Sequence, residues 1–401
     1  MLSTVLSILL FLGKTLLFIC LIALALTIAL FCHLSPIFKP FPRPTGPHAV
    51  GSHSFSWLDQ DRTTPVTHGT LQPRIVAAQV WYPIEGSVQA QPTAWYLPEK
   101  YAFFHRYISR YTRIPSWLLS PLLAFKTYEH PQAKPLASDT GYPVIVFSPG
   151  LAMGKELYSS FAQELASQGF VVVGLDHQDD SFLTLAPNGR AVLLTDLFGG
   201  VDPVASIEHK FDIMVEARKT DVAFVLNRLE EINNNPQHLL CGIFDFSHLG
   251  IMGHSLGGRT AFELCLSDPR FKAGINLDGD IAMADSNKPN STPLLCMVGE
   301  LGFKHAPNLA PKELTRFNVS SEQLKDYVCS VRPRIENYCE KNNTTCSCIL
   351  VEGTTHNAFS DLALAKWPIS ISLRTQGIPG KQIIQVINIH AVRFFSKHLK
   401  S

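Results

Sequence analysis

The chain has 401 residues, a net charge of +1 and only 17% charged residues, while 46% of its residues are hydrophobic. Because the sequence also contains no long run of Lys and Arg, it lacks the basic footprint of a nucleic-acid-binding protein. The length exceeds that of a usual single domain, but one α/β domain with insertions and an N-terminal anchor can account for it.

The N-terminal segment, residues 1–33, is almost wholly apolar. Residues 15–32 alone supply 18 positions, which is just enough to span a bilayer. A secretory signal peptide is the alternative, although its apolar stretch is normally shorter and ends in an Ala-x-Ala-like site. We favour an uncleaved anchor. The flanking charges, Lys14 on one side and Lys39 and Arg43 on the other, do not decide its orientation.

A stiff tether and an early strand are expected next. Residues 36–47 carry five prolines and one glycine, so residues 34–47 are predicted to form a tether. Residues 74–82 are β-rich and predict an antiparallel strand. An insertion at about 94–133 includes residues 95–128, where ten aromatic residues lie among basic ones. This mixture is typical of a lid or a membrane-interface surface, or of a helical insertion packed on the core.

Short apolar runs alternate with helical patterns along the rest of the chain. The runs are typical of buried parallel strands and lie at residues 142–147, 170–175, 248–252, 273–277, 294–298 and 349–351. The helical segments lie at residues 156–167, 207–232, 259–266 and 383–398. This alternation predicts an α/β fold, with a mostly parallel central sheet and helices on both faces.

The stretch Gly253-His254-Ser255-Leu256-Gly257, followed by Gly258, joins one of these strands to a helix. A strand, a tight turn and a helix in this order form a nucleophile elbow, where small residues let the backbone pass closely and expose the serine. The five-residue pattern alone is weak, and its context gives it specificity. Ser255 is therefore the predicted nucleophile, and His254 is expected to pack under the elbow.

A serine of this kind needs a histidine base, and in hydrolases with this elbow the acid and then the histidine follow the serine in the chain. The histidines after Ser255 are His305, His356, His390 and His398. His356 lies in a turn just after the last predicted strand, where this fold delivers its base. His390 and His398 fall in the terminal helix, where surface or packing roles are commoner.

The acid is less well determined. Asp278 directly follows the strand after the elbow helix, Asp280 is close by, and Glu300 follows the next strand. All three remain candidates at this level, with Asp278 favoured.

Two backbone N–H groups must bind the oxyanion of the tetrahedral intermediate. One is expected from Leu256, directly after the nucleophile. The other is expected from Leu151, in the loop Ser148-Pro149-Gly150-Leu151, because Gly150 permits a close approach. His177, at a strand end, is assigned to structure or pocket lining.

Four of the nine cysteines lie within 20 residues, at Cys329, Cys339, Cys346 and Cys348. They predict disulfides and hence an oxidising compartment, with a metal site or unpaired thiols as alternatives. Most of this cluster falls in a polar insertion at about 302–347, which is expected to form a loop or small cap near the site. Asn-x-Ser/Thr sequons begin at Asn290, Asn318, Asn342 and Asn343.

Together, these pieces resemble the secreted and intracellular platelet-activating-factor acetylhydrolase family, calcium-independent lipid esterases of α/β-hydrolase fold. Matching segments run from about residue 46 to the C-terminus: residues 46–51, 80–83, 146–151, 165–172, 253–258, 277–278 and 353–359. The resemblance implies that Ser255, Asp278 and His356 form the triad and that Leu151 and Leu256 supply the oxyanion donors. It selects Asp278 over Glu300.

The chain departs from the family pattern at positions that border the pocket. The family usually has His and Gly at the positions of Pro149 and Ala152, Phe at that of Leu256, and often Ala-Trp at 279–280. The acyl-chain preference can therefore differ from that of the relatives.

The expected protein is a membrane-anchored serine esterase with a catalytic domain over 48–401 in an extracytoplasmic compartment, or a secreted one if the N-terminal segment is cleaved. It would cleave short or oxidised acyl groups from phospholipid-like esters at a membrane surface, with no metal or organic cofactor. A general carboxylesterase or polyester hydrolase, and a hydrolase-like binding protein without activity, are the alternatives.

Overall fold

The computed structural model describes residues 2–34, 41–65, 71–87, 94–95, 126–194, 206–301, 320–365 and 378–400. The chain divides into two compact units, Met1–Pro40 with Trp95–Phe125, and Phe41–Ala94 with Lys126–Ser401. Most of the aromatic insertion and the start of the polar insertion therefore lie outside the described residues, as do His305 and Asn318.

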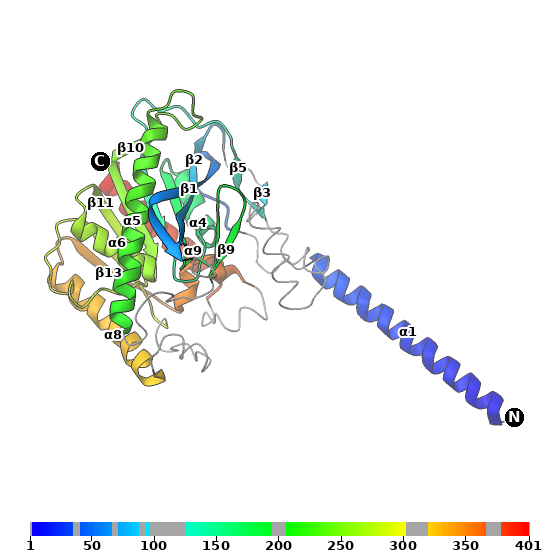
Figure 1. Ribbon diagram of the computed structural model, residues 1–401. Helices are drawn as coiled ribbons and strands as arrows, with labels where there is room; N and C mark the ends of the chain where they lie inside the picture. The colour runs from blue at the N-terminus through cyan, green and yellow to red at the C-terminus, as the bar shows by residue number, and fades with distance from the viewer. Residues whose placement is uncertain are drawn as a thin grey trace. The chain divides into compact units, whose positions relative to one another are not determined.

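The first unit contains helix α1 (Leu2–Leu34), drawn in blue in Figure 1. Its window Phe11–Ile28 has a mean hydropathy of 2.3 and is fully exposed. A helix of this length and composition can cross a membrane, and a signal sequence near an N-terminus would have the same properties.

The second unit is built on a nine-stranded sheet in the order β13-β12-β11-β10-β6-β7-β2-β1-β5. From β7 to β13 all neighbours are parallel, whereas β2 is antiparallel to both β1 and β7. The strands are β1 (Ala49–Pro65), β2 (Leu71–Ile84), β5 (Glu129–Pro131), β6 (Tyr142–Ser148), β7 (Val171–His177), β10 (Phe244–His254), β11 (Phe271–Leu277), β12 (Leu294–Gly299) and β13 (Cys346–Val351). The short strands are β3 (Ala94–Trp95), β4 (Lys126–Thr127), β8 (Leu183–Leu185) and β9 (Ala191–Leu193).

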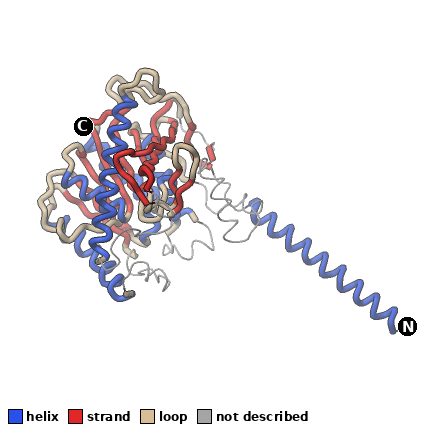
Figure 2. The backbone as a smooth tube through the Cα atoms, viewed as in Figure 1, coloured by secondary structure: helices blue, strands red, loops and turns tan. Residues whose placement is uncertain are grey.

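Helices cover both faces of this sheet (Figures 1 and 2). Those described are η1 (Lys155–Tyr158), α4 (Ser159–Ser167), α5 (Ile207–Asn233), α6 (Leu256–Ser267), α8 (Ser321–Lys341), η2 (His356–Phe359), η3 (Asp361–Leu364) and α9 (Gly380–Leu399). One apolar core joins the sheet to α5, α6 and α8, with Val146, Leu226 and Phe262 among its members. The other face carries α4 and α9, where Gly250 of β10 lies directly under Phe395 and Leu399.

The predicted mostly parallel sheet with helices on both faces is confirmed, and each predicted strand and helix is present. One segment differs. Residues 321–341 form helix α8 rather than a loop or small cap, because Val328, Val331, Ile335 and Tyr338 recur at helical spacing and are buried in the core. The polar composition of the segment hides this apolar stripe.

The last residues of the predicted tether, 41–47, pack within the second unit instead of forming a free linker. Residues 41–47 belong to the second unit, where Phe41 is buried. The Thr45 N–H donates to a carboxylate oxygen of Glu164 at 2.9 Å, and the Gly46 N–H donates to Ser167 Oγ at 3.1 Å. This part of the chain is therefore bound along α4.

Candidate active site

Strand β10 turns into helix α6 at a single residue, Ser255. Its φ of 55° and ψ of −121° place a non-glycine residue in a strained region of the backbone map. The Ser255 N–H donates to the carbonyl oxygen of Leu277 at 2.9 Å, so the end of β11 supports this conformation. The local geometry matches the elbow that the sequence predicts.

The glycines around the serine are required by close backbone contacts. A Cβ on Gly253 would lie 2.0 Å from the carbonyl oxygen of Gly257, and a Cβ on Gly257 would lie 2.0 Å from that of Ser148. Such distances exclude any side chain unless the backbone moves. The elbow therefore lies directly against the loop that follows β6.

The ring of His356 lies between Ser255 and Asp278. Its Nε2 is 2.9 Å from Ser255 Oγ, and its Nδ1 is 2.7 Å from Asp278 Oδ2. Because a carboxylate can only accept, Nδ1 carries the proton, and the lone pair of Nε2 faces the serine. The Gly299 N–H donates to the other Asp278 oxygen, Oδ1, at 2.8 Å and fixes the carboxylate.

Access to the three side chains differs in a way that suits catalysis. The Asp278 side chain is fully buried, whereas that of His356 is 29% exposed. Ser255, at the carboxyl end of the central strand β10, is half-buried. A substrate can therefore reach the serine and the histidine, while the carboxylate stays shielded from water.

The loop after β6 places the second predicted donor beside the first. The side chain of Leu151 packs on an apolar cluster formed by Leu256 with Met214 and Val215 of α5. Leu256 is the first residue of α6, so its N–H has no acceptor within its own helix. Ala152 in this loop has φ of 61°, a conformation that favours glycine.

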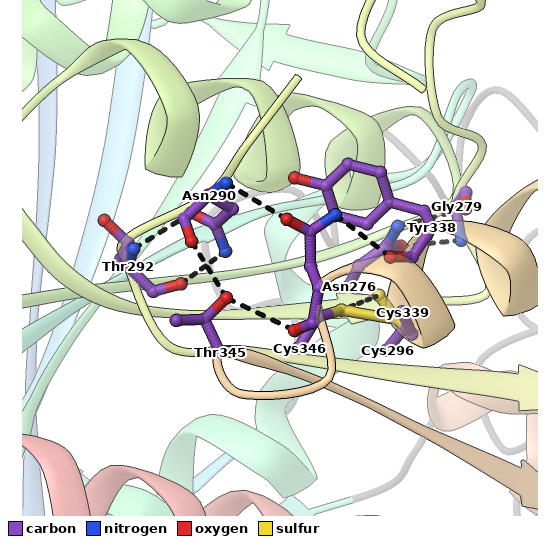
Figure 3. Close-up of a disulfide and its surroundings, with 10 residues drawn as sticks. Asn276, Gly279, Asn290, Thr292, Cys296, Tyr338, Cys339, Thr345 and Cys346 are labelled. Atoms are coloured by element: carbon purple, nitrogen blue, oxygen red, sulfur yellow. Dashed lines mark hydrogen bonds between the residues drawn. A yellow bond between two sulfur atoms is a disulfide. The ribbon is translucent and has the colours of Figure 1, made fainter. Parts of the chain in front are cut away.

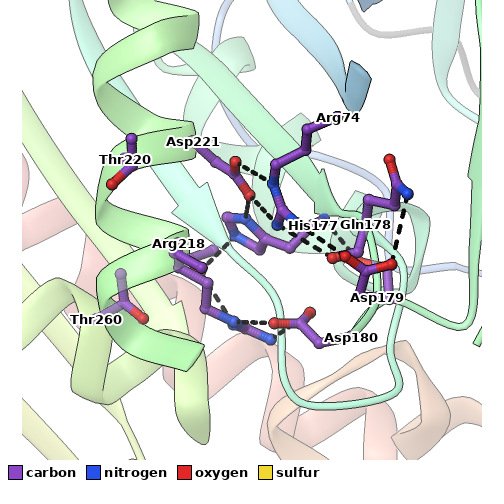
Figure 4. Close-up of polar contacts among 12 residues, drawn as sticks. Arg74, His177, Gln178, Asp179, Asp180, Arg218, Thr220, Asp221 and Thr260 are labelled. Carbon is purple, nitrogen blue, oxygen red and sulfur yellow. Dashed lines mark hydrogen bonds and ion pairs between the residues drawn. The ribbon is translucent and has the colours of Figure 1, made fainter. Parts of the chain in front are cut away.

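A buried network of charges supports this loop from behind (Figure 4). Arg218 of α5 pairs with Asp180 through two hydrogen bonds of 2.7 and 2.8 Å and donates to the Pro149 carbonyl at 2.5 Å. Arg74 of β2 makes a matching bidentate pair with Asp221, with both bonds at 2.8 Å. The guanidinium groups are thereby paired and hydrogen-bonded, as buried charges must be.

This network contains a second Ser-His-Asp arrangement. His177 Nε2 lies 3.0 Å from Ser148 Oγ, and His177 Nδ1 lies 2.9 Å from Asp221 Oδ2. The side chains are buried, with 0% exposure for each residue, and Arg218 also donates to Ser148 Oγ at 3.2 Å. Because the Ser148 hydroxyl is fully buried and bound by both His177 and Arg218, we assign these residues to support of the loop.

The platelet-activating factor acetylhydrolase, isoform II, family matches residues 37–188 and 209–401. The chain belongs to this family. The resemblance predicted from the sequence is therefore confirmed, and the match includes the elbow, Asp278 and His356.

Three relatives share low sequence identity with the chain. The platelet-activating factor acetylhydrolase of Cavia porcellus is 26% identical over 66% of this chain and 59% of its own length. That of Gallus gallus is 24% identical over 89% of this chain and 83% of its own length. A probable 1-alkyl-2-acetylglycerophosphocholine esterase of Arthroderma benhamiae is 30% identical over 35% of this chain and 32% of its own length. The matched part thus spans less than two thirds of two of these three relatives.

A solved structure shares the fold. The ferulic acid esterase from Streptomyces cinnamoneus superposes with a TM-score of 0.60 at 21% identity and covers 91% of this chain and 93% of its own. At this identity the likeness concerns the fold alone, and it confirms the predicted α/β-hydrolase fold of the family.

The other acids considered for the triad face elsewhere. Asp280 pairs with Arg334 at 3.0 Å and contacts Tyr327, and burial raises the pKa of its carboxyl. The carboxylate of Glu300 accepts the Gly353 N–H at 2.9 Å. Among the other histidines, His390 and His398 lie in α9, where His398 packs on Phe394.

The cysteine cluster forms one disulfide, between Cys339 of α8 and Cys346 of β13 (Figure 3). The thiol of Cys296 lies 4.0 Å from the Cys346 sulfur, so three buried sulfurs share one site that could in reduced form hold a soft metal ion. Cys329 and Cys348 are free and exposed in the structure. The disulfide prediction is met by one pair.

Two residues of the site escaped the sequence reasoning. Tyr158, at the end of η1, accepts the Gly150 N–H at 2.9 Å, and Arg218 binds the carbonyl of the preceding residue, Pro149. Both polar groups of the Pro149–Gly150 peptide are therefore hydrogen-bonded. No motif marks these residues, because their role depends on contacts between distant segments.

Proposed function

We propose that this protein is a serine-dependent carboxylic ester hydrolase in which Ser255 is the nucleophile, His356 the base and Asp278 the residue that orients it. The observation that carries the proposal is the position of the His356 ring, within 2.9 Å of Ser255 Oγ and 2.7 Å of Asp278 Oδ2. Membership of a family named for acetylhydrolase activity supports it.

The reaction would proceed in two steps. Ser255 Oγ attacks the ester carbonyl carbon while His356 Nε2 takes the hydroxyl proton, and the N–H groups of Leu151 and Leu256 bind the oxyanion. His356 then protonates the leaving alcohol, and the acyl group remains on Ser255. Water attacks this acyl-serine, with His356 again as the base, and releases the carboxylic acid and the free serine. The chemistry requires no metal ion or organic cofactor.

The proposed substrates are phospholipids that carry a short or oxidised acyl group. Two relatives of the chain are a platelet-activating factor acetylhydrolase and a probable 1-alkyl-2-acetylglycerophosphocholine esterase, and we extend their substrate class to this protein. The side chains around the serine are apolar, since Leu256 and Met214 are buried in one cluster against which Leu151 packs, and such surroundings suit a lipid-like ester.

The proposed location is at a membrane, with residues 1–33 as an anchor or signal segment and the catalytic domain in an extracytoplasmic compartment. Helix α1 is long and apolar enough to span a bilayer. The Cys339–Cys346 disulfide supports an oxidising environment. The lipid surface would then supply the substrate.

The first test is labelling of the full chain, purified in detergent, with a fluorophosphonate probe. Wild type should be labelled and Ser255→Ala should not, while Ser267→Ala, at the end of α6, should label like wild type. Absence of labelling in the folded wild type would contradict a serine hydrolase and favour a binding protein.

The substrate class requires a separate comparison of kcat/KM. Acetyl and oxidised-acyl phospholipids should be hydrolysed faster than long-acyl phospholipids and at least as well as a nitrophenyl ester. Turnover of the nitrophenyl ester alone would leave the serine mechanism intact and identify a general carboxylesterase.

A further inference from the structure

A chain of buried hydrogen bonds leads from the loop after β6 to the backbone of His356. The Gly150 N–H donates to Tyr158 Oη at 2.9 Å, and Tyr158 Oη lies 2.8 Å from His254 Nδ1. On the other side of the imidazole, His254 Nε2 lies 2.9 Å from the carbonyl oxygen of His356. Two side chains thus join the loop that carries Leu151 to the residue that serves as the base.

The two ends of this chain fix the direction of every bond in it. The Gly150 N–H can only donate and the His356 carbonyl can only accept. His254 therefore carries its proton on Nε2, and its Nδ1 has only a lone pair to offer. The Tyr158 hydroxyl has a second possible acceptor, Met153 Sδ at 2.9 Å, but a thioether sulfur is a weak acceptor, so the hydroxyl proton is directed to His254 Nδ1. Burial lowers the pKa of His254 well below its usual value and raises that of Tyr158, which keeps both groups in the neutral forms that this pattern needs.

Packing holds both rings in place. The rings of Tyr158 and Phe147 are 4.5 Å apart between centroids, and those of His254 and His356 are 4.8 Å apart. Space beside them is tight, because a Cβ on Gly150 would lie 3.0 Å from His254 Nδ1 and 3.2 Å from Tyr158 Oη, so these neighbours would have to shift by a few tenths of an ångström. The space admits the hydrogen bonds and little else.

The carbonyl group of the Pro149–Gly150 peptide is also hydrogen-bonded. Arg218 donates to the Pro149 carbonyl, and the adjoining Gly150 N–H binds Tyr158. With both groups bound, the plane of the Pro149–Gly150 peptide is fixed, and this plane sets the path of the backbone into Leu151. Tyr158 thereby orients one predicted oxyanion donor, while His254 fixes the backbone of the base.

We propose that Tyr158 and His254 are positioning residues that hold the oxyanion loop and His356 at a fixed distance from each other. They do so through a relay of hydrogen bonds that all donate in the same direction, from Gly150 to His356. The proposal rests on the proposed function, since it concerns that same site. Neither residue exchanges a proton with the substrate. Their effect is to place the oxyanion donor and the base so that both can contact the same tetrahedral intermediate.

The kinetic test uses Tyr158→Phe, which keeps the ring and removes the hydroxyl. Misplacement of reacting groups by a fraction of an ångström to 1 Å lowers rates by about 10- to 100-fold, so kcat per folded enzyme should fall by that factor with KM nearly unchanged. Tyr142→Phe is the matched control, because its hydroxyl contacts the Leu136 carbonyl at 3.2 Å, away from the site. Wild-type kcat in Tyr158→Phe would overturn the proposal, even if the variant were less stable.

A pair of variants at His254 separates its two contacts. His254→Gln places an amide N–H where Nε2 donates to the His356 carbonyl, whereas the shorter side chain in His254→Asn reaches only toward Tyr158. We expect His254→Gln to recover at least part of the kcat that His254→Asn loses. Equal loss in both variants would count against the relay.

Nitrogen-15 NMR of the full chain, with labelled histidine and in the Ser255→Ala background, tests the relay without turnover. The spectrum should show His254 as the Nε2–H tautomer. The resonance of the proton on His356 Nδ1 should shift or broaden in Tyr158→Phe. An Nδ1–H tautomer, or an unchanged His356 signal, would refute the relay. If the wild type hydrolyses no ester, the proposed function fails, while these signals still decide whether Tyr158 positions His356.

Discussion

Ser255 Oγ lies 2.9 Å from His356 Nε2, although 101 residues separate the two in the chain. Ser255 is at the start of α6, and His356 begins the short helix η2 after β13. The two strands that precede them, β10 and β13, are separated in the sheet by β11 and β12. The distance between serine and base therefore depends on the register of the intervening parallel strands.

The acid of the triad can be tested by two substitutions at strand ends. Asp278→Asn should lower kcat by about 10⁴-fold, because an amide at this position no longer holds the Nδ1–H tautomer of His356. Glu300→Gln is the control, since a glutamine can still accept the Gly353 N–H. Its kcat should stay close to that of wild type. Steady-state hydrolysis of a nitrophenyl ester, normalised to folded protein, measures both, and the opposite order of effects would move the acid to Glu300.

The contact between the elbow and the oxyanion loop leads to a stability prediction. A Cβ on Gly257 would lie 2.0 Å from the Ser148 carbonyl oxygen, so Gly257→Ala must displace backbone and should destabilise the fold by about 2 kcal/mol or more. The activity should be lost as well, because the displaced backbone leads to Leu151.

The control for this variant is Gly242→Ala. Gly242 has φ of 75° but nothing within 4 Å of its added Cβ, so only backbone strain of about 1 kcal/mol is expected. Urea unfolding of both variants gives the comparison. Equal midpoints for the two would contradict the close contact at Gly257.

The features of the site that the sequence could predict are those encoded in short segments. Ser255 sits in a five-residue pattern with its own strand and helix, and His356 follows the last apolar run. The neighbouring sequence alone does not distinguish Asp278 from Glu300 as the acid, because both residues follow strands. In the structure their carboxylates have different partners, His356 for Asp278 and the Gly353 N–H for Glu300, and the proposed assignment of Asp278 rests on this difference.

Tyr158 and Arg218 show why the rest could not be predicted. Each lies in a helical segment where a tyrosine or an arginine is unremarkable, and each becomes important only when the loop after β6 folds against it. Helix α8 was missed for a different reason. Its polar residues outnumber the apolar stripe that packs on the core, and the average composition therefore resembles that of a loop.

A buried carboxyl near the site makes stability depend on pH. Burial raises the pKa of Asp361 to about 8, and the side chain contacts Ser160 of α4. The folded state therefore holds a proton that the unfolded chain releases. Its contribution is complete below about pH 4 and is lost as the pH rises to about 8, with a slope of up to about 1.4 kcal/mol per pH unit.

Asp361→Asn should flatten the dependence of unfolding free energy on pH between 5 and 8. Glu129, whose pKa burial raises to about 7, leaves part of the slope in place. Asp268→Asn is the control, because the pKa of Asp268 is lowered and its partner is Arg270, so neither charge changes in this range. Urea unfolding at several pH values measures the slopes, and an unchanged slope in Asp361→Asn would show that Asp361 is ionised in the fold.

The disulfide between α8 and β13 gives a prediction that also separates it from a metal site. Cys339 and Cys346 are seven residues apart, and closing a loop of this size typically stabilises a fold by about 2 to 3 kcal/mol. Cys339→Ser should lower the free energy of unfolding by about this amount, whereas Cys329→Ser should change it little, because Cys329 is exposed and free.

Alkylation of the native protein separates the disulfide from a metal site. The reagent should modify Cys329 and Cys348 and leave the Cys339–Cys346 pair intact in a peptide map. Cys296, buried against that pair, should react only after unfolding, since burial also raises the pKa of its thiol. Recovery of Cys296, Cys339 and Cys346 as free thiols, together with one bound zinc per chain, would replace the disulfide with a metal centre.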